Sequence, residues 1–203
     1  MRPKMIDIDV ADESLTGFAS NVTGATWTLT NTTPTDGLAH QVSIRNDAAV
    51  NHSAKTATLV GTDADGKALT ETINLPNTSA TVESTKYFKT LTSITPSATI
   101  GTDTMDIGWV DEVSSQTIPI DWRSPYAMNI SVDVTGTLNF TVQQTFADVL
   151  GGVAAVWSDI TALASKSADT TSVAAVGATA IRIITSSYSS GAELQMYMNQ
   201  AQD

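Results

Sequence analysis

The chain has 203 residues, of which 41% are hydrophobic and only 15% are charged, with a net charge of −11 and no cysteine. This length allows one large core or two domains of about 100 residues, and the absence of cysteine excludes disulfides, thiolate metal sites and thiol nucleophiles. The acidic balance argues against direct binding of nucleic acid, which needs Lys and Arg to displace counterions from phosphates.

The N-terminal residues include charges but no apolar run behind them, so we expect no secretory signal. No segment reaches the roughly 20 apolar residues that would span a bilayer. We therefore expect a protein that is made in the cytosol and has no membrane partner. Residues 7–12 alternate acidic and apolar side chains, which predicts an arm or an added strand outside the core.

The first half of the chain shows short period-two patterns separated by turn residues, which is typical of antiparallel sheets. Residues 55–60 and 68–75 predict a hairpin, because the Asp and Gly residues between them favour a turn. Further strands are predicted at residues 39–46, 80–84, 87–94 and 105–109.

A domain boundary is predicted within residues 111–117, which are polar and show no apolar periodicity. The two expected domains are residues 1–112, including the N-terminal arm, and residues 113–203.

The second half of the chain shows the same short runs of alternating apolar and polar residues. Residues 128–134 and 138–142 alternate apolar and polar side chains on either side of Thr135-Gly136, which predicts a second hairpin. Residues 153–163 are expected to form a helical turn or an irregular loop. Strands are predicted at residues 170–176, 179–185 and 192–199. The expected fold is all-β, with two antiparallel β-sandwich domains in tandem, Ig-like or jelly-roll-like.

Catalytic signatures are missing from the sequence. His40 and His52 are the only histidines, and neither has a Ser, Asp or Glu at a spacing typical of a catalytic pair. The common nucleophile-elbow, phosphate-loop and zinc-protease motifs do not occur. We therefore expect both histidines to be structural or solvent-exposed, and we expect no enzymatic activity, no cofactor and no metal.

A calcium-binding loop is an alternative that the acidic residues leave open. Asp63-Ala64-Asp65-Gly66 begins like a calcium loop, but Asp-rich hairpin turns are common for backbone reasons alone, and Glu71 falls within a strand. Glu71 interrupts the apolar side of Leu69 and Ile73, which indicates a strand edge or a subunit contact.

Four tryptophans, Trp27, Trp109, Trp122 and Trp157, are expected to serve as core residues or interface anchors. Carbohydrate-binding sandwiches also expose Trp and Tyr, so a glycan-binding module is an alternative. No two aromatic residues stand two apart on one predicted strand, which weakens that alternative.

Two parts of the chain, residues 60–72 with 84–94 and residues 118–126 with 132–146, resemble small β-sandwich virion proteins of tailed bacteriophages and prophages. The resemblance implies a non-enzymatic virion structural protein built from β-sandwiches, without catalytic residues, and leaves its position in the particle open. Our leading expectation is a capsid decoration protein that binds the assembled shell. A neck or tail component, such as a head-to-tail connector, a collar or a fibre anchor, is the alternative. The implied partners are copies of the chain itself and other virion proteins.

Overall fold

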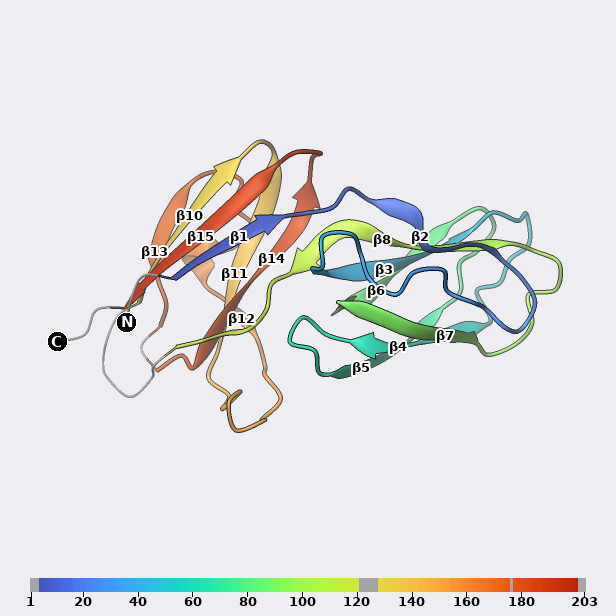
Figure 1. Ribbon diagram of the computed structural model, residues 1–203, viewed down its shortest axis with the longest axis horizontal. Helices are drawn as coiled ribbons and strands as arrows, with labels where there is room; N and C mark the ends of the chain where they lie inside the picture. The colour runs from blue at the N-terminus through green and yellow to red at the C-terminus, as the bar shows by residue number, and fades with distance from the viewer. Residues whose placement is uncertain (1–3, 121–127, 176, 201–203) are drawn as a thin grey trace. The chain divides into compact units, whose positions relative to one another are not determined.

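The computed structural model describes residues 4–120, 128–175 and 177–200 of the chain (Figure 1). Within these residues the fold is all-β, as predicted, with fifteen strands, one short 3-10 helix and no α-helix. The abundance of β-branched Thr, Val and Ile accounts for this, because these side chains favour extended backbone. None of the described residues belongs to a helix long and apolar enough to cross a membrane.

The chain divides into two compact units. We call Ala11–Val113 the inserted unit, because it interrupts the other one in sequence. The split unit combines Met1–Val10 with Ser114–Asp203. The chain leaves the inserted unit between Val113 and Ser114, one residue from the boundary expected between residues 112 and 113. It enters the inserted unit between Val10 and Ala11. The expected assignment of the N-terminal segment is therefore corrected, because this segment belongs with residues 114–203 and not with the rest of residues 1–112.

The inserted unit contains two sheets, with the strand orders β2-β8-β3-β6 and β5-β4-β7. Its strands are β2 (Ser14–Val22), β3 (Ala39–Asn46), β4 (Thr56–Thr62), β5 (Ala68–Asn74), β6 (Thr81–Phe88), β7 (Thr90–Pro96) and β8 (Met105–Ser114). One buried cluster draws side chains from both sheets, among them Phe18, Val42, Ile44, Leu59, Phe88, Leu91, Ile94, Met105 and Ile107.

The hairpin predicted at residues 55–75 is confirmed, because β4 and β5 pair from Thr56↔Asn74 to Thr62↔Ala68. The polar residues expected to form a linker extend β8 instead, as far as Ser114. Val113 is fully buried on this extension, so the strand continues to bury a side chain although its neighbours Asp111 and Glu112 are polar.

Strand β2 has no counterpart among the predicted strands. Its pairing with β8 shifts register between Ser14 and Ala19 and again between Ala19 and Val22. Such bulges break the period-two alternation, and the neighbouring residues Phe18 and Ala19 are consequently both buried. A search for alternating polarity therefore misses this strand.

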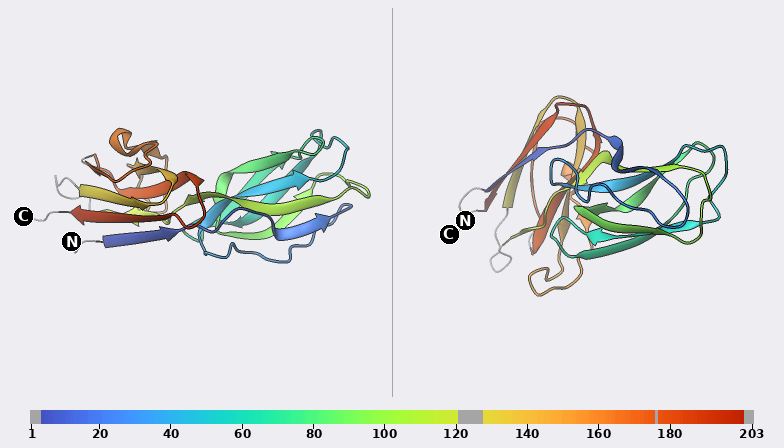
Figure 2. Two further views of the ribbon diagram at one scale, coloured as in Figure 1. Left: turned by 90° about the horizontal axis from the view of Figure 1, so that it is seen from above. Right: turned by 45° about the vertical axis from the view of Figure 1, so that its right-hand side comes forward.

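The split unit contains the sheet β1-β15-β10-β13 and the strands β12-β11-β14, with β9 also paired to β14. Its elements are β1 (Lys4–Asp9), β9 (Ile118–Pro119), β10 (Met128–Thr135), β11 (Leu138–Thr145), β12 (Ser158–Asp159), η1 (Thr161–Leu163), β13 (Thr170–Val173), β14 (Ala180–Tyr188) and β15 (Glu193–Gln200). Strand β1 lies antiparallel beside β15 (Figure 2), from Lys4↔Met198 to Asp9↔Glu193. Ile8 and Val10 are buried, so this segment is part of the unit's core and not a free arm.

The predicted hairpin at residues 128–142 is wrong. Strands β10 and β11 exist, but β10 pairs with β13 and β15, whereas β11 pairs with β12 and β14. The turn between them, with Gly136 at φ 81°, carries the chain from one sheet to the other. Both strands bury alternate side chains, and that pattern is the same whether two strands pair or lie in different sheets.

Candidate functional site

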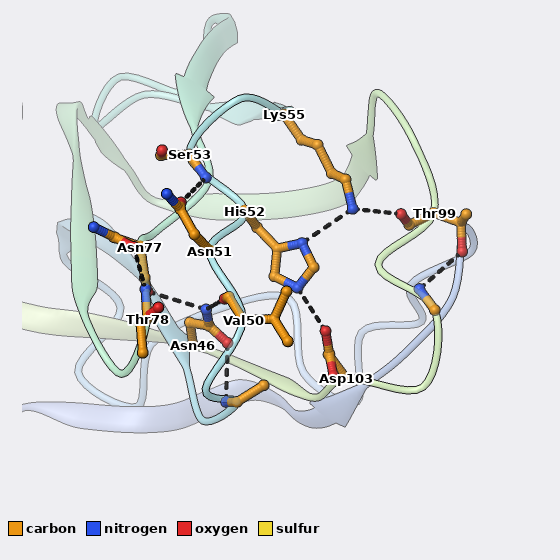
Figure 3. A network of polar contacts seen from close by, with 12 residues as sticks. Asn46, Val50, Asn51, His52, Ser53, Lys55, Asn77, Thr78, Thr99 and Asp103 are labelled. Atoms are coloured by element: carbon orange, nitrogen blue, oxygen red, sulfur yellow. Dashed lines mark hydrogen bonds and ion pairs between the residues drawn. The ribbon is translucent and has the colours of Figure 1, made fainter.

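Three connections of the inserted unit bring polar side chains together, as Figure 3 shows. They are residues 47–55, 75–80 and 97–104, which follow β3, β5 and β7. His52 is 3% exposed. Its backbone N–H donates to the carbonyl of Pro76 at 3.3 Å, and its own carbonyl accepts the N–H of Lys55 at 2.8 Å. The imidazole is thus enclosed by the connections that it joins.

The hydrogen bonds of His52 define its protonation. Nδ1 lies 3.0 Å from Nζ of Lys55, and Nε2 lies 2.9 Å from Oδ2 of Asp103. An ammonium can only donate and a carboxylate accepts, so Nδ1 is the acceptor and Nε2 carries the hydrogen. His52 is therefore a neutral imidazole. Lys55 also donates to the carbonyl of Thr99 at 2.8 Å, which fixes its side chain in turn.

Asn46 organises the neighbouring part of the same region. It is 1% exposed, its Nδ2 donates to the carbonyls of Val50 and Asn77, and its Oδ1 accepts the N–H of Ala48. One buried amide thus joins two connections and closes a local turn, which is a common role for Asn in turns. The polar residues of this region hold the loops in place with their hydrogen bonds.

His40 forms a second centre. It is fully buried on β3, with Nδ1 at 2.6 Å from the carbonyl of Val110 and Nε2 at 2.8 Å from Oδ2 of Asp36. Both partners are acceptors, so both ring nitrogens must carry a hydrogen. His40 is therefore an imidazolium paired with the Asp36 carboxylate. The ring of Trp109 lies 6.2 Å from the His40 ring.

Asp36 receives two further hydrogen bonds, from the backbone N–H of Ala11 at 2.7 Å and that of Leu38 at 2.9 Å. Burial alone would raise the pKa of the Asp36 carboxyl, but its hydrogen bond to His40 and the two backbone donors outweigh burial and lower it. The His40–Asp36 pair thereby ties Ala11, where the chain enters the inserted unit, to Val110 near its exit.

Both histidines are buried and contact a carboxylate, which their sequence spacing does not reveal. A general base needs a lone pair within hydrogen-bond reach of the substrate. On His40 and His52 all four ring nitrogens already have partners within the fold. The arrangement is suited to fixing loops and strand ends.

Asp63 closes the turn between β4 and β5. Its Oδ1 accepts the backbone N–H groups of Asp65 and Lys67, both at 2.9 Å. This is the backbone role that an Asp plays in a hairpin turn. Among the described residues, no group of three or more His, Cys, Asp or Glu side chains is placed to hold a metal ion.

Glu71 joins two edge strands that belong to different sheets. Its Oε1 accepts the N–H and the hydroxyl of Thr85 at 2.9 and 2.7 Å, and its Oε2 accepts the N–H of Lys86 at 3.0 Å. Lys86 returns a hydrogen bond from Nζ to the carbonyl of Thr70. The carboxylate that interrupts the apolar side of β5 therefore satisfies backbone donors of β6.

Three of the four tryptophans lie in the described residues. Trp27 and Trp109 are buried, and Trp109 meets Phe18 edge to face and donates from Nε1 to the carbonyl of Asp12. Trp157 is half-buried in the split unit, with the Arg182 guanidinium 4.6 Å from its ring centroid. Trp122 lies outside the described residues.

A carboxylate pair that the sequence analysis does not single out lies around Arg45. The guanidinium contacts Asp106 at 2.8 Å and Asp47 at 2.9 Å, and Asp106 is 3% exposed. Burial and the neighbouring Asp106 raise the pKa of Asp47, against the opposing effect of Arg45. Asp106 is 61 residues from Arg45, and no sequence pattern connects them.

Comparison of the chain with protein-family models, with curated proteins and with solved structures gave no match.

Proposed function

We propose that this chain is a structural protein of a tailed bacteriophage particle and that it binds the outside of the assembled capsid shell. The main support is that the side chains best suited to chemistry are engaged in holding the fold together. His40 and His52 use all their ring nitrogens internally, and Asp63 and Glu71 bind backbone amides. Such a chain offers surfaces for docking.

We also propose that each unit is an antiparallel β-sandwich. In the inserted unit, the buried cluster with members from both sheets supports this, because two sheets that bury one set of side chains must face each other. In the split unit, alternate residues are buried on β10 and β15 of one sheet and on β11 and β14 of the other.

The proposed partners are copies of the same chain and other virion proteins, with the major capsid protein first among them. A net charge of −11 disfavours contact with packaged nucleic acid. Sheet surfaces rich in Thr and poor in charge suit lateral contacts in a lattice.

Immunogold labelling tests this proposal. An antibody against the purified chain is applied to phage particles from lysates of the strain that carries the gene. We expect label over the capsid. Label confined to the neck or tail would select the connector, collar or fibre-anchor alternative. Particles without label, together with retention of the purified chain on a glycan array, would overturn the virion proposal in favour of a glycan-binding module.

A further inference from the structure

Strands β1, β15, β10 and β13 lie side by side in one sheet of the split unit (Figure 1). Alternate side chains of this sheet are buried, such as Ile8 and Met196. The side chains between them point the other way, because successive residues of a strand alternate between the two sides of a sheet. We call this other side the outer face. It carries exposed residues of all four strands, among them Asp7, Asp133 and Tyr197.

The strand register arranges the carboxylates of the outer face in two adjacent rows. Asp7 lies opposite Gln195, which lies opposite Asp133. In the next row, Asp9 lies opposite Glu193. Opposite residues have Cβ atoms about 5 Å apart, and residues two apart along a strand are separated by about 7 Å. Four carboxylates therefore lie within one small area of the sheet.

The outer face carries no basic side chain among these strands. The four strands contain one Lys, Lys4, and no Arg. Lys4 lies opposite the buried Met198, and so on the other side of the sheet from Asp7. The ion pairs of the described residues involve other carboxylates, namely those of Asp36, Asp47, Asp103 and Asp106. The negative charge of the outer face is therefore not balanced within the described part of the chain.

Apolar side chains lie beside the acidic rows on the same face. Met5 lies opposite Tyr197, one row away from Asp7. The side chains of Met5 and Tyr197 are 53% and 37% exposed, and Val173 on the edge strand β13 is 50% exposed. Met and Tyr are enriched in protein–protein interfaces, where polar residues surround them. The outer face combines exposed apolar side chains with unbalanced charge, which is the composition of a docking surface.

Charge selects the partner of the outer face. Nucleic acid and anionic lipid carry charge of the same sign and are repelled. A second copy of the chain also carries a net charge of −11 and is disfavoured at this face. Metal binding needs converging ligands, and no group of three or more His, Cys, Asp or Glu within the described residues is placed to hold an ion. A protein surface with Lys and Arg next to apolar side chains complements the outer face in both respects.

We infer that the outer face docks a different protein through a patch of Lys and Arg side chains. An area four strands wide and three rows long covers roughly 400 Å², about half of what each partner buries in a standard interface. The contact should therefore be weak, and it should be sensitive to salt because exposed charges are screened. That this partner is a virion protein rests on the proposed function, whereas the charge of its contact surface does not.

NMR titration of the isotope-labelled full chain tests the charge of the partner. The probe is a capped synthetic peptide that alternates Lys with Thr, and a matched peptide carries Glu in place of Lys. At low ionic strength, the Lys peptide should shift the amide signals of residues 5–9, 131–135 and 193–197, and the Glu peptide should shift none. Raising the salt to about 0.15 M should weaken binding severalfold. Signal changes spread evenly over both units, or no changes at low ionic strength, overturn the inference.

Paired variants separate the outer face from net charge. Asp133→Asn/Glu193→Gln removes two carboxylates of the acidic rows and should weaken binding of the Lys peptide about fivefold, through the loss of two exposed ion pairs. Asp65→Asn/Glu83→Gln removes the same charge from exposed positions of the inserted unit and should change the affinity less than about twofold. Equal weakening by the two variants would overturn the inference. Unchanged circular dichroism spectra check the fold of both.

Immunogold labelling of particles does not depend on this titration. Label over the capsid without binding of the Lys peptide would overturn the inference about the outer face and leave the proposed function in place. Binding of the Lys peptide at the acidic rows, with particles that carry no label, would support the inference and count against the proposed function.

Discussion

His40 and His52 are both buried next to a carboxylate, but their second partners differ. A carbonyl faces the other nitrogen of His40, whereas an ammonium faces that of His52. The first arrangement requires an imidazolium and the second a neutral ring. Burial is therefore compatible with either charge state, and the local donors and acceptors determine which one the fold contains.

A thermodynamic cycle tests the charged pair. His40→Gln should lower the free energy of unfolding by about 3–5 kcal/mol, because it leaves the Asp36 carboxylate buried without its cation. The double variant His40→Gln/Asp36→Asn should be destabilised less than the sum of the two single variants, since the unpaired charge is gone. Urea unfolding of the wild type, His40→Gln, Asp36→Asn and the double variant gives the coupling free energy between the two side chains. Additive effects would show that the two side chains do not act as a pair.

The pKa of Asp36 also predicts an acid dependence. Because it is lower in the folded chain than its usual value of 3.8, Asp36 stabilises the fold above that pH. The stabilisation is lost as the pH falls through the folded-state pKa. Thermal unfolding between pH 6 and 2 should show a steeper loss of stability for the wild type than for Asp36→Asn. Parallel curves would contradict the prediction.

The pKa of Glu112 is shifted in the opposite direction to that of Asp36. Burial, then the charges of Glu83 and Asp111, raise the pKa of Glu112 above its usual value of 4.5. Its folded form binds a proton more tightly than its unfolded form, so the ionised carboxylate destabilises the fold at neutral pH. Glu112→Gln should raise the unfolding midpoint at pH 7, and the gain should vanish below about pH 4. Glu193→Gln, at an exposed position, should change neither value.

The turn role of Asp63 can be predicted from sequence, because its partners lie within four residues. The contacts of His40 and His52 cannot be predicted from sequence in this way. His52 and Asp103 are 51 residues apart, and His40 and Val110 are 70 apart. Neither contact leaves a local pattern, since both depend on how the strands pair.

At the scale of elements, Glu71 binds an edge of one sheet to an edge of the other. Glu71→Ala removes the acceptor for the amides of Thr85 and Lys86. Hydrogen exchange of these two amides should accelerate about tenfold, which corresponds to about 1.4 kcal/mol, the size of one or two net hydrogen bonds. Exchange in β10 and β11 should stay unchanged. If the two amides keep their protection, the carboxylate does not hold the edges together.

Period-two alternation identifies most strands of this chain but not their partners. It places β10 and β11 correctly along the sequence and then suggests that they pair, although each pairs with more distant strands. Alternation reports which side chains are buried, and strands in two facing sheets bury theirs in the same way. Bulged strands such as β2 leave no alternation to detect.

At the scale of the whole molecule, the inserted unit has its own core, and the split unit is composed of two separate parts of the chain. We predict that a fragment of residues 11–113 folds cooperatively. A fragment of residues 114–203 should fold poorly, because it lacks β1 and the buried side chains of Ile8 and Val10. Amide NMR spectra of both fragments provide the measurement.

A synthetic peptide of residues 1–10 should restore dispersed signals to the second fragment. The matched control is the same peptide with Ile8→Asp, which places a charge at a fully buried position and should not restore them. A fragment 114–203 that folds fully without any peptide would show that β1 is dispensable.

The pairing of β1 with β15 also has a consequence for synthesis. The ribosome adds Ile8 to the chain 186 residues (194 − 8) before its partner Leu194. At common elongation rates of about 5–20 residues per second, β1 waits roughly ten to forty seconds for that partner. The inserted unit can fold during this interval. A message cut short before β15 therefore yields a product with one finished domain and one open sheet, which proteases can recognise and remove.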